Sequence, residues 1–254
     1  MHYIAAAETD AGSGGRINQD SLMIRHAASP AGEILLAVLC DGMGGLCQGE
    51  AASGAVLKSF ADWFERDLPR HLPVPDPEMI RPEWEARLAR LNRQLAACAS
   101  GENSRMGTTF AGLLLIGDRF LLMNVGDSRI YHIGACLRQL TMDHSFVAAE
   151  AAAGRLSPAE ARRDRRRNLL LQCIGASRQI RPYAAAGQVR PGAYLLCSDG
   201  FYHEPEEDEL CRALAPDRLV SREVMHRQLR SLIDLAIDRR EQDNLSAIII
   251  RIIS

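Results

Sequence analysis

Four aspartates stand at the edges of apolar runs that are spread over the whole chain. They belong to the segments Asn18-Gln19-Asp20, Asp41-Gly42-Met43-Gly44-Gly45, Ser198-Asp199-Gly200 and Asp243-Asn244. Acidic side chains at the ends of buried strands repel one another and lose water on folding, so their convergence requires hard cations. Oxygen ligands of this kind suit magnesium and manganese. The sequence therefore predicts a site for Mg²⁺ or Mn²⁺.

The glycines after Asp41 allow a second interpretation, a dinucleotide-binding loop. A strand, a Gly-rich turn and a helix occur in the required order, but the pattern Gly-x-Gly-x-x-Gly fails because Cys47 occupies the third glycine position. An aspartate at the mouth of the turn would also repel a pyrophosphate, whereas glycines let a backbone carbonyl approach a metal ion. We therefore favour a cation site over a nucleotide site or a purely structural turn.

Composition excludes several classes of protein. The chain has 254 residues, 47% hydrophobic residues and a net charge of -2, which favours one globular domain over residues 1–254 and no affinity for nucleic acid or anionic membranes. None of the seven cysteines forms a Cys-x-x-Cys motif, which favours core packing in a reducing compartment. No basic segment precedes a long apolar stretch at the N-terminus, and no run has membrane-spanning length. We expect a cytoplasmic protein.

The first half of the chain predicts a strand followed by two helices. Glu33 to Cys40 is a buried strand that ends at Asp41. Apolar residues then recur with helical spacing from Ala52 to Phe64. Prolines interrupt this pattern, and a second amphipathic helix follows them from Trp84 to Cys98.

The second half predicts an antiparallel meander with one helical interruption. Short strands over 108–116, 119–125, 128–133 and 136–140 are separated by Gly-containing turns, which favours antiparallel pairing in chain order. A helix over 146–153 precedes a second helix start at Ser157. A strand over 194–197, a long helix over 224–236 and a final strand over 246–253 follow. The order predicts antiparallel sheets flanked by helices.

Seven segments, in this order, resemble the metal-dependent protein phosphatases, the PPM family, also called protein phosphatase type 2C. They are Arg16-Ile17-Asn18-Gln19-Asp20, Asp41-Gly42-Met43-Gly44-Gly45, Met106-Gly107-Thr108-Thr109, Asn124-Val125-Gly126-Asp127-Ser128-Arg129, Leu140-Thr141-Met142-Asp143-His144-Ser145, Ser198-Asp199-Gly200 and Asp243-Asn244-Leu245-Ser246. Met43 and the Asp-His-Ser segment resemble the bacterial branch. The resemblance implies an α+β fold, a four-layer αββα sandwich in which helices flank two central antiparallel β-sheets, with a binuclear metal centre at one end.

The resemblance also assigns metal ligands. Asp41 would bridge two Mg²⁺ or Mn²⁺ ions, and the backbone carbonyl of Gly42 would bind one of them. Asp199 and Asp243 would complete the pair, while Asp20 would support it through a coordinated water. Asp127 resembles the residue that holds a third ion together with Asp199 in bacterial members. An alternative for Asp127 is a structural turn in which the neighbouring arginine pairs with a carboxylate.

Two further roles follow from the family pattern. An arginine before the first acidic motif binds the substrate phosphate, and Arg16 is the candidate, although it stands four rather than five positions before Asp20. An exposed arginine in a Gly-rich turn can also be simply solvated. Met43 stands where eukaryotic members have the histidine that protonates the leaving group. His144 or a metal-bound water would replace that histidine, unless His144 instead satisfies the backbone.

Residues 145–170 occupy the position of the family's flap, beside the catalytic cleft. Five arginines make this segment basic, namely Arg162, Arg163, Arg165, Arg166 and Arg167. They form either a solvated helix face or a surface that attracts acidic or phosphorylated substrates.

The function implied is that of a serine/threonine phosphoprotein phosphatase acting through a metal-activated water. Its expected partners are phosphorylated proteins and a bacterial Ser/Thr kinase whose action it reverses, and we expect a monomer. Two alternatives stay open. One is a catalytically silent phosphoprotein-binding or regulatory module on the same fold, which the retention of four aspartates disfavours. The other is a phosphatase for a regulatory anti-sigma antagonist.

Overall fold

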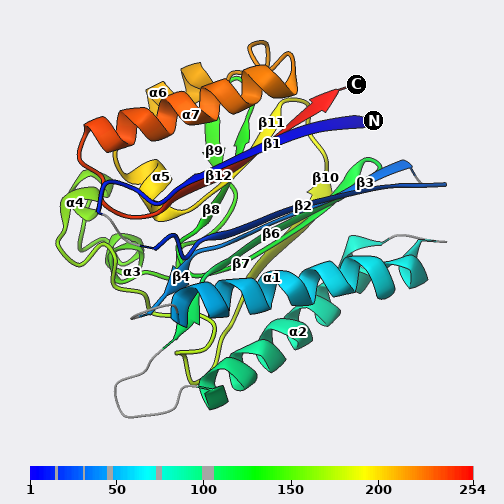
Figure 1. The fold of residues 1–254 in the computed structure, drawn as a ribbon, viewed down its shortest axis with the longest axis horizontal. Helices are drawn as coiled ribbons and strands as arrows, with labels where there is room; N and C mark the ends of the chain where they lie inside the picture. The colour runs from blue at the N-terminus through cyan, green and yellow to red at the C-terminus, as the bar shows by residue number, and fades with distance from the viewer. Residues whose placement is uncertain (15–16, 31, 45–47, 73–75, 99–105, 254) are drawn as a thin grey trace.

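Two five-stranded antiparallel sheets face each other in the middle of the molecule (Figure 1). The computed structural model describes residues 1–14, 17–30, 32–44, 48–72, 76–98 and 106–253. The first sheet has the strand order β1 (His2–Asp10), β12 (Leu245–Ile253), β11 (Ala193–Cys197), β8 (Arg129–Ile133) and β9 (Leu137–Gln139). The second has the order β10 (Tyr183–Gln188), β7 (Arg119–Val125), β6 (Phe110–Ile116), β3 (Gly32–Cys40) and β2 (Ser21–Ser29). A small ribbon joins β4 (Gly42–Met43) to β5 (Gly107–Thr108).

Helices cover the outer face of each sheet. The second sheet is covered by α1 (Gln48–Arg66) and α2 (Pro77–Cys98), with the 3-10 helix η1 (Leu68–His71) between them. The first sheet is covered by α6 (Glu207–Ala213) and α7 (Arg222–Asp238). Three short helices, α3 (Phe146–Ala152), α4 (Pro158–Arg163) and α5 (Asp199–His203), gather at one end of the sandwich. The predicted four-layer αββα sandwich is thus confirmed.

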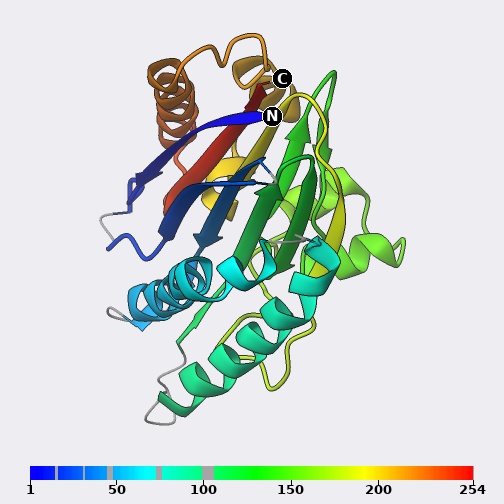
Figure 2. The same ribbon diagram turned by 90° about the vertical axis from the view of Figure 1, so that its right-hand side faces the viewer.

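Three apolar layers hold the sandwich together, and β3 contributes to two of them. Ile34, Leu36 and Val38 pack under α1 and α2, whereas Leu35 and Leu39 face the other sheet. Successive side chains of a strand point to opposite faces, so a strand buried on both sides needs a continuous apolar run. The position of β3 between two cores therefore explains the continuous apolar run that predicted a strand ending at Asp41. The two chain ends lie side by side because β1 and β12 pair along their length (Figure 2).

The second helix begins earlier than its apolar spacing predicts. It starts at Pro77, and Pro82 lies inside it, so the prediction that prolines precede the helix is wrong. Pro77 stands at the first helical position, where a missing N–H costs nothing. Pro82 removes one hydrogen bond near the start of the helix, and the burial of Ile80 and Trp84 on either side of it offsets that loss.

The predicted antiparallel meander is wrong at one connection, the one between β7 and β8. β6 pairs with β7, and β8 pairs with β9, as expected. β7 and β8 lie in different sheets, because the chain crosses the sandwich through Gly126 and Asp127. Gly126 has a φ of 99°, a conformation that favours glycine and turns the chain out of the hairpin path. This crossing places Asp127 at the end of the sandwich.

The edge strand β10 was not predicted. Its sequence, Tyr-Ala-Ala-Ala-Gly-Gln, has neither apolar alternation nor β-branched residues. All six of its residues pair with β7, opposite Arg119 to Asn124, so tertiary pairing rather than local propensity forms it. Within the part of the chain that the structure describes, no helix combines the length and apolar character needed to cross a membrane.

Candidate metal centre

Five aspartates come together at the ends of strands and the start of a short helix, close enough for their charges to act on one another. Asp20 comes directly before β2 and Asp41 directly after β3, and these strands are antiparallel neighbours. Asp199 opens α5 just after β11, and Asp243 comes just before β12, which are also antiparallel neighbours. Asp127 lies in the crossing from β7 to β8. Antiparallel pairing thus brings together carboxylates that are far apart in the sequence.

The five carboxylates are close enough to change one another's proton affinity. Burial raises the pKa of Asp41 well above its usual value, and the charges of Asp20 and Asp199 raise it further. The pKa of Asp199 rises in the same way, through burial and then the charges of Asp127 and Asp243. Burial also raises the pKa of Asp20 to about 6. Without a cation, ionising these carboxyl groups therefore costs the folded chain free energy.

Unpaired oxygen atoms show that this set fits a bound cation. Both carboxylate oxygens of Asp20 and Oδ1 of Asp199 are buried without a hydrogen-bond partner. A buried carboxylate oxygen without a partner is costly, and a hard cation is the ligand that relieves that cost. Carboxylate and backbone oxygens, completed by waters, are the ligands that Mg²⁺ accepts, so these residues fit that ion.

The backbone around Asp41 is held by the Gly-Thr-Thr segment. The Asp41 N–H donates to Thr109 Oγ1 at 2.9 Å, and the Thr109 N–H donates to the Asp41 carbonyl at 2.8 Å. The Thr108 hydroxyl donates to the same carbonyl at 2.9 Å. These bonds explain why two threonines are needed opposite Asp41, and they fix the direction in which the chain continues after β3.

Gly42 is packed too closely for any side chain. A Cβ atom there would lie 2.4 Å from the carbonyl oxygens of both Gln19 and Gly49. The first acidic segment and the start of α1 therefore approach the backbone directly. Only glycine fits at this position, because any Cβ would collide with backbone on two sides.

Glu241 orders the loop of Asp243, and sequence reasoning missed it. Its Oε1 accepts the N–H groups of Gln242 at 2.8 Å and Asp243 at 3.1 Å. Asn244 then joins the two chain ends, because its Oδ1 accepts the Gln19 N–H at 2.9 Å. A carboxylate two residues before an aspartate is the only signal in the sequence, and it is common in ordinary turns.

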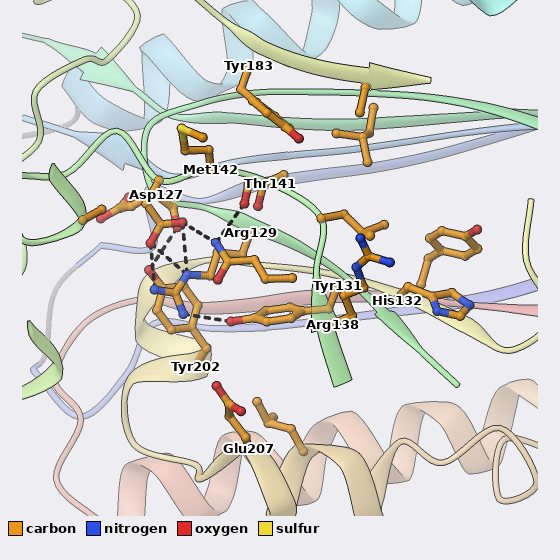
Figure 3. A pocket seen from close by; sticks show the side chains of 18 of the residues that line it. Asp127, Arg129, Tyr131, His132, Arg138, Thr141, Met142, Tyr183, Tyr202 and Glu207 are labelled. Carbon is orange, nitrogen blue, oxygen red and sulfur yellow. Dashed lines mark hydrogen bonds and ion pairs between the residues drawn. The ribbon is translucent and has the colours of Figure 1, made fainter. Parts of the chain in front are cut away.

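Asp127 is buried in a turn whose neighbouring arginine pairs with a carboxylate. Its side chain is 5% exposed, and its carbonyl accepts the Tyr202 hydroxyl at 3.0 Å. Burial raises its pKa to about 7, and the charge of Asp143 adds to the effect. The neighbouring Arg129 pairs with Asp143 through Nε at 2.9 Å and Nη2 at 2.7 Å, and it lies 3.8 Å over the ring of Tyr202 (Figure 3). The arginine therefore has a structural partner in Asp143, and its charge only partly offsets the rise in the pKa of Asp127.

His144 binds the backbone of this turn. The imidazole Nδ1 of His144 accepts the Gly126 N–H at 3.1 Å, and the backbone N–H of His144 donates to the Gly126 carbonyl at 2.8 Å. Burial lowers the pKa of the imidazole. A neutral ring whose Nδ1 accepts a backbone N–H fits the backbone-satisfying alternative. Arg16, the predicted phosphate ligand, lies outside the described residues.

A buried histidine next to the carboxylates was also missed. His203 Nδ1 lies 3.9 Å from both Asp199 Oδ2 and Glu241 Oε2. Burial lowers its pKa to about 3, and the charge of Arg167 lowers it further, so the ring is neutral near neutral pH. Its position in the last turn of α5 carries no local signal that separates it from a core histidine.

The flap arginines divide into two groups. Arg162 donates to the carbonyls of His203 at 3.0 Å and Pro205 at 2.8 Å. Arg166, in the turn after α4, pairs with Asp164 at 2.7 Å, and Arg167 reaches within 4.0 Å of Glu241. Arg163 and Arg165 are exposed, and neither forms an ion pair within the described ranges. Only these two remain available to attract a substrate from solution.

A four-layer sandwich with acidic residues converging at one end of both sheets defines a metal-binding αββα protein. Comparison with known families identifies it further, since residues 9–249 match the family described as protein phosphatase 2C. The chain belongs to this family.

Its relatives are bacterial. The serine/threonine protein phosphatase PstP of Mycobacterium tuberculosis is 32% identical over 96% of this chain and 44% of its own length. Protein phosphatase PhpP of Streptococcus pneumoniae is 34% identical over 76% of each chain. The present chain thus spans less than half the length of PstP.

Solved structures share the whole fold. The serine/threonine phosphatase Stp1 from Staphylococcus aureus superimposes with a TM-score of 0.85 at 28% identity, over 100% of this chain and 96% of that one. The catalytic domain of PstP in complex with two manganese ions gives a TM-score of 0.79 at 29% identity, over 99% of both chains.

Proposed function

We propose that this chain is a metal-dependent phosphatase that removes phosphate from phosphoserine and phosphothreonine in proteins. The observation that carries the proposal is the convergence of five carboxylates whose oxygens are partly unpaired and whose charges repel one another. Membership of the protein phosphatase 2C family and the two manganese ions of the PstP structure support the same function. A silent binding module would gain nothing from such a costly cluster.

Each carboxylate has a proposed task in this reaction. Asp41, Asp199, Asp243 and the Gly42 carbonyl would hold two Mg²⁺ or Mn²⁺ ions, Asp20 would support them through water, and Asp127 would hold a third. When bound, such ions neutralise phosphate charge and activate water for attack. The chain itself contributes a fixed backbone around Asp41 and a buried floor that excludes bulk water.

Substrate binding and proton transfer fall to other groups. We propose that Arg16 binds the phosphate, because a guanidinium fork matches phosphate oxygens. His144 is not the proton donor in this proposal, because its Nδ1 already accepts a backbone N–H. The leaving alkoxide would take its proton from water.

The cellular setting is also part of the proposal. Residues 1–254 would act as one catalytic domain, a monomer in the cytoplasm, with residues 145–170 as its flap. Its substrates would be proteins phosphorylated by a bacterial Ser/Thr kinase. The exposed Arg163 and Arg165 would draw acidic segments of such proteins toward the flap.

A hydrolysis assay tests the proposed reaction. An aryl phosphate and a phosphothreonine peptide are incubated with manganese, magnesium or chelator, using wild type and Asp199→Asn. We expect metal-dependent turnover that the substitution reduces by at least about a hundredfold. Asp118→Asn, on the exposed hairpin between β6 and β7, is the matched control and should retain full activity. Turnover that persists in chelator, or in the Asp199 variant, contradicts the proposal.

A further inference from the structure

A cavity of ≈ 1040 Å³ lies between the open edges of the two sheets. Its walls come from β8 and β9 of the first sheet, from β7 and β10 of the second, and from α3 and α4. Of the five clustered carboxylates, only Asp127 lines it. The cavity therefore begins beside the candidate metal centre and continues away from it.

The cavity borders the edge of β10 rather than one face of that strand. Four consecutive residues, Ala185 to Gln188, line it, although successive side chains of a strand point to opposite faces. Within the described chain, β10 pairs only with β7, so its other edge is unpaired. Small side chains and an unpaired edge accept an extended chain as an added strand.

The two ends of the cavity differ in charge. Asp127, Arg129 and Tyr202 lie at one end, whereas His132 and Arg138 lie at the other (Figure 3). Asp127 and His132 are separated by five residues along β8 and the preceding turn, which corresponds to about 16 Å at roughly 3.3 Å per residue. An extended peptide of about five residues covers that distance.

Two unpaired arginines mark the far end. Arg138 and Arg190 are exposed lining residues, and neither forms an ion pair within the described ranges. Burial lowers the pKa of His132, and the charges of Arg190 and Arg138 lower it further, so all three side chains lie near one another.

The other arginines of the cavity are already occupied. Arg129 is bound to Asp143, and Arg162 is bound to backbone carbonyls and to Glu206. Arg167, the third of them, lies 4.0 Å from Glu241. The positive charge available to a ligand is therefore concentrated at Arg138 and Arg190. A ligand that reaches both ends must be long, and it must be acidic only at its far end.

We propose that this cavity docks an acidic segment of the phosphoprotein substrate, extended along β10, with carboxylates about four to six residues from the phosphorylated residue against Arg138 and Arg190. The proposal rests on the phosphatase function and specifies its substrate class. Apolar residues nearer the phosphorylated position would contact the walls formed by Leu122, Val147 and Tyr183.

Peptide kinetics test the docking. Phosphothreonine peptides carry two glutamates about five residues from the phosphothreonine, on either the N-terminal or the C-terminal side, and matched peptides carry glutamines. For one of the two glutamate series, wild type should show a kcat/KM about tenfold higher than for the matched glutamine peptides, through a lower KM. Arg138→Glu with Arg190→Glu should abolish that preference, while the two Arg→Lys changes preserve most of it. Turnover of an aryl phosphate should be unchanged in both.

The controls separate docking from general attraction and from misfolding. Arg222→Glu with Arg227→Glu reverses two exposed charges on α7 that do not line the cavity, and it should leave the preference intact. Ala151→Trp, on the cavity face of α3, should weaken peptide turnover but not aryl phosphate turnover. Equal turnover of the glutamate and glutamine peptides by wild type overturns the proposal. An equal loss of peptide turnover and aryl phosphate turnover in the variant with Arg138→Glu and Arg190→Glu also overturns it.

Binding measurements distinguish failure of the docking from failure of the phosphatase function. Anisotropy of a labelled, unphosphorylated glutamate peptide reports docking without turnover. If the chain hydrolyses nothing yet binds this peptide through Arg138 and Arg190, the docking stands and the phosphatase function is wrong. If a short glutamate tripeptide competes as well as the full peptide, the site takes a small anion and the extended docking is wrong.

Discussion

Asparagine in place of Asp127 should make the metal-free protein more stable at alkaline pH. The side chain is 5% exposed, and burial raises its pKa from 3.8 to about 7. At 1.36 kcal/mol for each tenfold change in proton affinity, this difference corresponds to about 4 kcal/mol that the ionised carboxylate costs the folded state. Burying the neutral amide still costs about 1–2 kcal/mol. Asp127→Asn should therefore raise the free energy of unfolding by about 2 kcal/mol in chelator.

The pH dependence gives the sign of this effect. Between pH 3.8 and about 7, the folded chain keeps a proton at Asp127 that the unfolded chain releases. The free energy of unfolding of the metal-free wild type therefore falls as the pH rises through this range, and the full cost is present above it. The gain from asparagine should follow the same curve, reaching its maximum near pH 8 and disappearing at acid pH. Manganese should reverse the order at pH 8, because it stabilises the ionised cluster.

Urea unfolding measures both effects. Wild type and Asp127→Asn are unfolded between pH 5 and pH 8, in chelator and in manganese, with the exposed Asp118→Asn as a matched control that should stay within about 0.5 kcal/mol of wild type. The reasoning is refuted if the metal-free wild type is equally stable across this range and the asparagine variant is no more stable at pH 8. A variant that is less stable in chelator at every pH would show that Asp127 is structurally paired rather than repelled.

Three further predictions concern the supports of the site. Gly42→Ala should lower the free energy of unfolding by at least about 2 kcal/mol, because its Cβ would meet two backbone carbonyls. Gly54→Ala in α1 is the matched control: its Cβ would meet nothing within 4 Å, and it should raise the free energy of unfolding by up to about 1 kcal/mol. Thermal unfolding of the two variants measures both changes. Arg129→Ala should lower the free energy of unfolding, measured in urea, by about 3 kcal/mol, because it leaves Asp143 buried without its cation. The double variant Arg129→Ala, Asp143→Asn should lose less, and an equal loss in the single and the double variant would contradict the pairing. His144→Gln should lower stability by about 1 kcal/mol yet leave the pH–rate profile unchanged, so the loss of one limb of that profile would restore the histidine as proton donor.

Local sequence determined most of the elements that carry the carboxylates. The continuous apolar run of β3, from Ile34 to Cys40, required burial on both faces, so it had to end where the next charge appears at Asp41. The helix start at Ser157 was equally local, since its side chain and that of Glu160 form the predicted capping box. Such features depend on a few neighbouring residues, and sequence reasoning recovers them.

The features that sequence reasoning missed depend on distant partners. β10 has no strand signal of its own and exists because β7 offers a complete edge. The turn at Gly126 resembles hairpin punctuation, and only the packing of the two sheets decides that the chain crosses there. Glu241 acts through two backbone N–H groups, a role that any acidic turn residue could fill.

The hydrogen bonds of the metal centre support backbone atoms more than carboxylate oxygens. Asp41 is held through its N–H and carbonyl, Asp127 through its carbonyl, and Asp20 through its N–H. Both carboxylate oxygens of Asp20 stay unpaired even though they are buried. A chain selected only for stability would neutralise these groups or replace them, because unpaired buried charge is costly. Fixing the main chain while leaving side-chain oxygens free preorganises a ligand set, at a cost in stability that a bound cation can offset.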